Sequence, residues 1–463
     1  GTSHPSPLIL LPFRVSTGNM EHALSENDRA NLILRDASFR DVLAMNPGGD
    51  TIRTVLTVKG DYLFNLFRSK AGIDGFREWF PKYIDDNAFQ SVDIVTLNND
   101  MKEKFGFEFY PYLSDWFSRK EQPGFIFTDL QANEVVVGDR VRYLVTFIAS
   151  NPEQVTGIFN ISFRTGGEGG GLMTGSFQGG PRGGSYTFSM QGRGMEASDI
   201  SRIILLGPGE AKKISIIIDT QPREMLINTL FARNIPGEII LPIDEVVKSR
   251  NRSNTDEGEE TLAVLPPYTY PGELIVDNED TGFDAGNMVA QPPLKKILGI
   301  KNRRGTSYQQ INMFWAPEYW QPVVLSSYYG KYIRSSVYTR AAKGDKSVVW
   351  KTGLDDPGFY DIWCYVGKTG DKMVVRSGVS GGAAPPPPPG GEPGGENVYK
   401  DMHYKIYHDE GVEEITVDFE NAEPGWNMLG RYYISSDTAK VELTNQSSGR
   451  MVLGDAIKWV KAD

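Results

Sequence analysis

The spacing of apolar residues divides the chain into a helical part and two β-rich parts. Between residues 20 and 120, apolar side chains recur at steps of three and four residues, as at Val55, Val58 and Tyr62, which is the period of a helix with one buried face. The segment "AGIDG" predicts a turn between two helices, and Ser91 is a suitable N-cap for a further helix. A helical domain over residues 1–124 is therefore expected.

Beyond a Pro-Gly break, the pattern changes to short alternating or β-branched runs separated by turns. Runs such as "VVVGDRVRYLVTFIAS" predict an immunoglobulin-like β-sandwich over residues 125–270. A second series of strand-like runs forms a third region, over residues 271–463. Its proline-rich and glycine-rich stretch at 380–397 predicts a disordered surface loop. The expected fold class is multidomain and mainly β.

Charge and cysteine content restrict the partners of this chain of 463 residues. Its formal net charge is −11, so it offers no broad basic face for phosphates, and neither nucleic acid nor an anionic membrane surface is an expected partner. One cysteine, Cys364, excludes an internal disulfide framework. Because Cys364 lies between Trp363 and Tyr365, it is predicted to be a buried thiol in a strand.

The early apolar run "PLILLPF" is too short to span a bilayer and lacks the charged start of a signal peptide. No membrane insertion by this segment is expected. The chain starts with Gly1 instead of Met, and we interpret it as a piece of a longer, exported precursor, located in the periplasm or at the surface of a bacterium.

The helical part resembles the end of the catalytic domain of aminopeptidase N family gluzincins, and the likeness extends into the following sandwich, over about residues 50–250. The positions that carry it are Lys59, Gly60, Leu63, Phe76, Phe80, Tyr83, Leu113 and Trp116. The resemblance implies that an inherited helical scaffold supports the first sandwich.

Two departures from that family argue against catalysis. The zinc motif His-Glu-x-x-His is absent, so zinc would be bound only if an upstream part of the protein supplied the site. Thr57 occupies the position of the family's catalytic tyrosine, and its shorter, less acidic hydroxyl is a poor substitute for a phenol at an oxyanion. None of the four histidines forms a pair at metal-binding spacing.

The last region resembles the golvesin C-terminal-like domain, also described as the xanthan lyase carbohydrate-binding-like domain, over about residues 272–463. The matching positions are Asp277, Asn278, Gly282, Phe283, Gly358, Tyr360, Trp426, Leu429, Gly430, Leu443, Asp455, Ala456, Ile457 and Trp459. The resemblance implies a second β-sandwich, of jelly-roll type, over residues 271–463, which binds or packs and performs no chemistry.

Two candidate sites lie in this region. An aromatic insert could form a face that stacks on sugar rings, with Tyr308, Trp315, Tyr319, Trp320 and Tyr328 as its members. The alternative is that these residues cover the sandwich and the neighbouring domain. The segment "DNEDTGFD" suggests a calcium site formed by Asp277, Glu279, Asp280 and Asp284, although Met288 stands where an EF-hand loop has its last ligand. The alternative is that these acids shape a turn.

The sequence thus favours the noncatalytic scaffold and binding region of an exported bacterial protein. Cell-surface glycan or another envelope protein is the expected partner, and the chain itself is expected to hold no cofactor apart from calcium. Two alternatives stay open. One is the C-terminal part of a zinc aminopeptidase whose metal site lies upstream of residue 1, and the other is a glycan-binding adhesion module.

Overall fold

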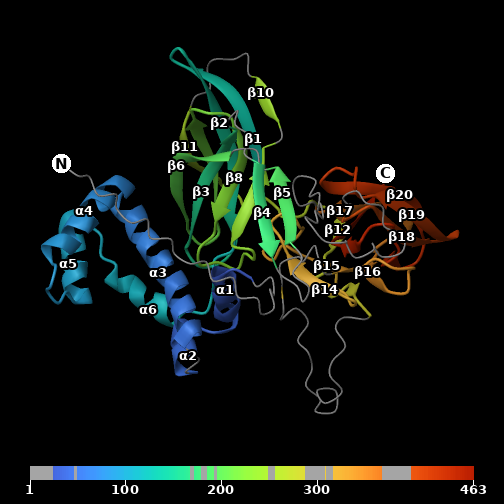
Figure 1. Ribbon diagram of the computed structural model, residues 1–463, viewed down its shortest axis with the longest axis horizontal. Helices are drawn as coiled ribbons and strands as arrows, with labels where there is room; N and C mark the ends of the chain where they lie inside the picture. The colour runs from blue at the N-terminus through green and yellow to red at the C-terminus, as the bar shows by residue number, and fades with distance from the viewer. Residues whose placement is uncertain are drawn as a thin grey trace.

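The computed structural model describes residues 24–45, 49–166, 172–178, 185–191, 195–243, 245–248, 256–286, 308, 316–367 and 398–462, with backbone alone for the strands within 166–200. A helical region is followed by several mostly antiparallel sheets, which confirms the expected mainly β, multidomain fold class. Figure 1 shows the first sandwich between the helices and the second sandwich. Trp315 and the stretch 380–397 lie outside the described residues.

Six helices form the first unit of the described chain. They are α1 (Glu26–Asp36), α2 (Phe39–Ala44), α3 (Gly49–Ala71), α4 (Ile73–Asp86), α5 (Ile94–Phe105) and α6 (Tyr110–Ser118). The turn predicted from "AGIDG" is confirmed, because Gly72 separates α3 from α4 with φ 83. Ser91 as an N-cap is wrong: α5 begins after Asp93, whose carboxylate accepts a hydrogen bond from the backbone N–H of Thr96. No described helix has the length and apolar character needed to cross a membrane.

The long helix α3 is the centre of this unit. Its residues Val55 and Val58 pack with Ala30 and Leu34 of α1, and Phe231 from the first sandwich joins the same cluster. The side chain of Trp116 in α6 donates a hydrogen bond from Nε1 to the backbone oxygen of Lys59, at 2.7 Å. The helices and the first sandwich therefore share buried apolar contacts.

The first sandwich has two main sheets and a separate two-stranded sheet. Its strands are β1 (Ile126–Val137), β2 (Arg140–Asn151), β3 (Gly157–Gly166), β4 (Leu172–Gln178), β5 (Ser185–Gln191), β6 (Met195–Leu206), β7 (Glu210–Ile218), β8 (Pro222–Asn228), β9 (Glu238–Pro242), β10 (Val246–Lys248) and β11 (Gly258–Thr261). The orders are β10-β1-β2-β7-β11, β6-β3-β8-β9 and β4-β5. Alternate residues of β7, among them Ile214, Ile216 and Ile218, enter a core that also holds Phe147 and Phe159.

The second sandwich contains the remaining strands. They are β12 (Glu273–Val276), β13 (Phe283–Asp284), β14 (Gln321–Val324), β15 (Ser335–Arg340), β16 (Ser347–Gly353), β17 (Gly358–Val366), β18 (Asp401–His408), β19 (Gly411–Asp418), β20 (Gly425–Ile434), β21 (Thr438–Thr444), β22 (Met451–Gly454) and β23 (Ile457–Lys461). Their sheet orders are β12-β23-β17-β20, β13-β16-β21-β18-β19 and β14-β15-β22. Trp350, Trp459 and Tyr404 fill the core, and the prediction of a buried thiol at Cys364 is confirmed.

The two sandwiches meet through backbone hydrogen bonds. The N–H of Ile235 donates to the oxygen of Tyr332 at 2.9 Å, and the N–H of Arg334 donates to the oxygen of Ile235 at 2.7 Å. The Tyr332 hydroxyl donates to Glu153 in the first sandwich at 2.7 Å. Its ring lies so close to Gly124 that a Cβ there would approach to 2.5 Å, so glycine is required at this point. Such a junction holds the sandwiches together more firmly than a free linker would.

Candidate functional site

One face of the sheet β12-β23-β17-β20 carries a row of aromatic side chains. Along β17, Tyr360, Ile362, Cys364 and Val366 are buried, so the intervening residues point to the opposite face. The aromatic residues of that outer face are Phe359, Trp363 and Tyr365 from β17 and Trp426 and Tyr433 from β20. We call these five residues the aromatic face.

The strand register brings these rings together in pairs. Phe359 lies opposite Tyr433 with ring centroids 5.2 Å apart, and Tyr365 lies opposite Trp426 at the same separation. The side chains of Phe359 and Tyr433 are 53% and 43% exposed. Solvent therefore reaches the aromatic face most freely at its Phe359 end. Phe359 and Tyr365 are six residues apart, which is about 20 Å along the strand at some 3.3 Å per residue.

Paired charges lie among the rings. Arg431 contacts Asp361 through two hydrogen bonds of 2.6 and 2.8 Å, between Phe359 and Trp363 along the sheet. At the other end, Lys458 bonds Glu273 at 2.9 Å and lies 4.8 Å from the Trp426 ring. Hydrogen-bond donors and acceptors thus stand next to apolar ring surfaces, as in many ligand sites.

The aromatic insert does not form the expected exposed face. Trp320 and Tyr328 are fully buried in the core of the second sandwich, and Tyr308 is buried in a smaller cluster. Among the described residues of the expected set, only Tyr319 is exposed, at 39%. The expectation of a sugar-stacking face is therefore wrong for Tyr308, Trp320 and Tyr328, because no ligand can lie on a covered ring.

Tyr308 shows why these aromatics are covered. It packs with Leu24, Ile235 and Val324, which come from the start of the described chain, the first sandwich and the second. Its hydroxyl donates a hydrogen bond to Glu279 at 2.8 Å. The alternative interpretation, that the insert covers the sandwich and its neighbour, agrees with these contacts.

The four acids of the suggested calcium site do not gather around one point. Among the described residues, no three His, Cys, Asp or Glu side chains are grouped so that they could hold a metal ion. Asp280 accepts a hydrogen bond from the N–H of Asp277 and closes a turn, Glu279 bonds Tyr308, and the exposed Asp284 lies in β13. The geometry favours the turn interpretation of this segment.

The same segment nevertheless places a carboxylate against a second one from the end of the chain. Val276 of β12 pairs with Ile457 of β23. Asp277 comes directly after Val276, and Asp455 lies two residues before Ile457, so the strand pairing brings the two aspartates to the same end of the two strands. Both are buried, at 6% and 2% exposure. Burial, and for Asp277 also the neighbouring Asp455, raises both pKa values well above the usual range. Asp277 and Asp455 are both among the positions that carry the golvesin-like resemblance, but nothing in the sequence indicates that their carboxyl groups lie close together.

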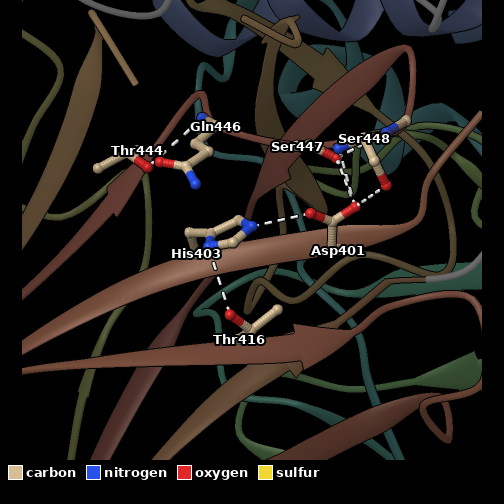
Figure 2. A network of polar contacts seen from close by, with 8 residues as sticks. Asp401, His403, Thr416, Thr444, Gln446, Ser447 and Ser448 are labelled. Atoms are coloured by element: carbon tan, nitrogen blue, oxygen red, sulfur yellow. Dashed lines mark hydrogen bonds and ion pairs between the residues drawn. The ribbon is translucent and has the colours of Figure 1, made fainter. Parts of the chain in front are cut away.

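A polar network on β18 and β19 includes the histidine His403. Figure 2 shows its ring between Asp401, whose carboxylate lies 2.8 Å from Nε2, and Thr416, whose hydroxyl lies 3.3 Å from Nδ1. The other oxygen of Asp401 accepts hydrogen bonds from the N–H and hydroxyl of Ser448. Burial opposes ionisation of Asp401, but the hydrogen bonds from Ser448 and His403 outweigh it and lower its pKa to about 2.

The order hydroxyl, imidazole, carboxylate is the order of a hydrolase triad. Here Thr416 is exposed and directly opposite His403 in the sheet register, so its hydroxyl stands in bulk water on an open sheet. The hydrogen bonds that Ser448 donates to Asp401 instead fix the loop between β21 and β22 to β18. We interpret the network as a structural clamp.

We expect Ser448→Ala to destabilise the second sandwich by about 1 kcal/mol, the usual net contribution of one hydrogen bond. Chemical denaturation monitored by tryptophan fluorescence measures the change. Ser436→Ala, which removes a bond between a serine and a nearby backbone oxygen at an exposed turn, is the control. Equal stability of the Ser448 variant and the wild type would contradict the clamp.

In the helical unit, Thr57 turns its hydroxyl back onto its own helix. Oγ1 donates to the backbone oxygen of Arg53 at 3.0 Å, on the exposed side of α3. The absence of catalysis by this chain and the likeness to aminopeptidases both stay predictions.

Comparison with known families identifies part of the second sandwich. Residues 392–461 match the family model described as Golvesin C-terminal domain. The match covers the strands from β18 to β23, which include Trp426, Tyr433 and Asp455. No curated protein matches the chain.

Solved structures show only distant likeness. A xanthan lyase from Paenibacillus matches over 74% of this chain and 26% of its own length, with 14% identity and a TM-score of 0.27. A GH26-CBM35 β-(1,4)-mannanase from Podospora anserina matches over 42% of this chain and 28% of its own, with 11% identity and a TM-score of 0.21. The chain thus spans about a quarter of the length of these enzymes, and scores this low say nothing about its activity.

Proposed function

We propose that this chain is a noncatalytic scaffold and binding region of an exported bacterial protein, and that the aromatic face binds a polysaccharide chain. The aromatic face itself carries this proposal. Rings that are partly open to solvent can stack on the apolar faces of sugar rings, while Arg431, Asp361 and Lys458 offer hydrogen bonds to sugar hydroxyls.

The junction between the sandwiches supports the scaffold role. Because Ile235 and Tyr332 are joined by backbone hydrogen bonds and Tyr332 reaches Glu153, the aromatic face is held at a defined distance from the helices. A binding face on a rigid support is suited to holding a polymer at one place relative to a neighbouring domain.

Affinity electrophoresis in gels that contain neutral or acidic polysaccharides tests the binding. Phe359→Ala, Trp363→Ala and Tyr433→Ala should each weaken retention by about fivefold, since one stacking contact contributes about 1 kcal/mol. The matched control is Tyr319→Ala, because its ring has nearly the same exposure as Tyr433 but lies outside the aromatic face.

Retention that is unchanged in all three variants would contradict the assignment to the aromatic face. Loss of retention in Tyr319→Ala alone would assign the polysaccharide-binding site to the aromatic insert instead. An intact fold in each variant is verified by its unfolding midpoint, so that loss of binding is not confused with unfolding.

A further inference from the structure

Arg334, which directly precedes β15, carries a guanidinium group with unused hydrogen-bond donors. Its Nη1 donates a hydrogen bond to the backbone oxygen of Ser326 at 2.7 Å. Within the described part of the chain, Nε and Nη2 have no hydrogen-bond partner, and no carboxylate lies within ion-pair distance of the group. A guanidinium has five N–H donors in a rigid fork that fits a carboxylate. One side of this fork is therefore available to a ligand.

The loop that ends at Arg334 joins the aromatic face at its Tyr365 end. The N–H of Leu325 donates to the backbone oxygen of Arg334 at 3.1 Å and so closes the loop between β14 and β15. Within this loop, the ring of Tyr329 lies 5.4 Å from that of Tyr365 and 5.2 Å from that of Trp426. The loop thus brings an arginine and a further aromatic ring to the same place.

The charge of Arg334 acts on the tyrosines at this end. Burial raises the pKa of Tyr365 and of Tyr268, and the nearby positive charge of Arg334 opposes both rises. Burial also lowers the pKa of Arg334 itself, because its charge is shielded from water without a partner. The residue as a whole is half-buried, so solvent still reaches part of it. A bound anion would relieve this uncompensated charge.

The other cations of the aromatic face already have partners. Arg431 donates two hydrogen bonds to Asp361, and Lys458 donates one to Glu273. A ligand carboxylate that approached Arg431 or Lys458 would have to displace the carboxylate of the protein. At Arg334 it would displace only water, so this residue is the favoured position for an anionic group.

The loop between β14 and β15 restrains Arg334 before any ligand arrives. Its residue Gly330 has φ 142, and a Cβ there would collide with the backbone oxygen of Ile333. Tyr328 of the same loop is only 1% exposed and packs in the core of the second sandwich. A charged group that is held in place loses little conformational entropy on binding. Arg334 is therefore pre-organised for a ligand.

We propose that the polysaccharide bound by the aromatic face is acidic, and that Nε and Nη2 of Arg334 bind one of its carboxylate groups. The inference rests on the polysaccharide binding proposed above and specifies the ligand. Sugar rings stack on the aromatic face, while the carboxylate of a uronic acid forms two parallel hydrogen bonds with the guanidinium. A single guanidinium is not the broad basic face that nucleic acid requires.

Affinity electrophoresis of the full chain with matched polymers tests the assignment. Polygalacturonate and its methyl ester share a backbone and differ in charge, as do carboxymethyl cellulose and hydroxyethyl cellulose. Arg334→Gln should weaken retention by the carboxylated polymers about tenfold, the scale of a hydrogen bond to a charged group, and leave retention by the uncharged ones unchanged. Arg334→Lys keeps the charge without the fork and should lose less. Arg340→Gln, at an exposed position of β15, is the control.

A second measurement does not depend on the polymer backbone. Galacturonate should raise the unfolding midpoint of the wild type, since a ligand that binds only the folded state stabilises it, whereas galactose should not. Arg334→Gln should show no such rise. If that variant does not fold, the comparison of the two sugars on the wild type decides alone.

The outcomes separate this inference from polysaccharide binding itself. Equal loss of retention by charged and uncharged polymers in Arg334→Gln, no loss at all, or equal midpoints with galacturonate and galactose would overturn the role of Arg334. Phe359→Ala should weaken retention by both members of each pair. If it weakens neither, or if the wild type is retained by no polymer, polysaccharide binding by the aromatic face is contradicted as well.

Discussion

Lys59→Met is expected to stabilise the helical unit by about 2 kcal/mol at neutral pH. Lys59 is only 2% exposed, and burial lowers the pKa of its ammonium group from 10.5 to about 8. A shift of that size corresponds to about 3 kcal/mol of unfavourable burial of the charged form. Methionine fills a similar volume without a charge.

Part of that penalty is already offset in the wild type. The Lys59 ammonium lies 4.2 Å from the centre of the Phe231 ring and 5.8 Å from that of Trp116. Such cation–π contacts contribute about 1 kcal/mol when they are shielded from water. Removing them reduces the expected net gain from about 3 to about 2 kcal/mol.

The wild-type stability should also depend on pH in a defined direction. The folded state releases the Lys59 proton near pH 8, whereas the unfolded state keeps it until about 10.5. Between these values the unfolded state binds more protons, so the free energy of unfolding rises with pH. Lys59→Met should lack this rise.

Denaturation followed by far-ultraviolet circular dichroism measures the effect, since the described helices all lie in this unit. Lys70→Met, at an exposed position of the same helix, is the matched control and should change little. A less stable Lys59→Met variant would show that the ammonium group contributes more than its burial costs.

Asp455→Asn is expected to stabilise the second sandwich by about 1–3 kcal/mol at neutral pH, the scale of one unsatisfied buried polar group. Oδ1 of Asp455 is buried and accepts no hydrogen bond from a described residue. From the described part of the chain, Oδ2 accepts only a long hydrogen bond, from the N–H of Tyr329 at 3.3 Å. Asparagine retains the shape of the side chain and removes its repulsion of Asp277.

The pH dependence that arises from Asp455 and Asp277 has the opposite sign to that of Lys59. Burial raises the pKa of Asp455 and of Asp277 well above 3.8, so the folded state keeps protons that the unfolded state has lost. The contribution of these two carboxyl groups to stability is therefore greatest in acid and falls as pH rises from about 3.8 through the folded pKa values. The variant should lose much of this slope.

Tryptophan fluorescence during urea unfolding, recorded from acid to neutral pH, tests this expectation. Asp277→Asn should act in the same direction, and the double variant should gain less than the sum because the carboxyl groups interact. Asp355→Asn changes an exposed carboxylate of the same sandwich and is the control. An Asp455→Asn variant that unfolds more easily at neutral pH would contradict this expectation. It would mean that other interactions offset the cost of burying the two carboxylates.

The repeat of apolar positions was sufficient to predict the type of each unit. Val55 and Val58 recur at helical spacing and are buried in α3, and the alternation around Cys364 places the thiol in the core. Such periodicities depend only on backbone geometry, which is local. The start of α5 was predicted two residues early because Ser91 and Asp93 are both good N-caps, and their sequence does not decide between them.

Which aromatic residues are open to solvent was decided by the tertiary structure alone. Trp320 and Trp363 both lie in aromatic-rich segments, yet the first is fully buried and the second lies on an outer face. The alternation in "GFYDIWCYV" separates two faces of a strand, but only the packing of sheets determines which face is covered. The pairing of Asp277 with Asp455 likewise joins residues from opposite ends of the second sandwich. Local sequence determined helices, strands and their faces, while contacts between distant segments decided which side chains meet water and which meet one another.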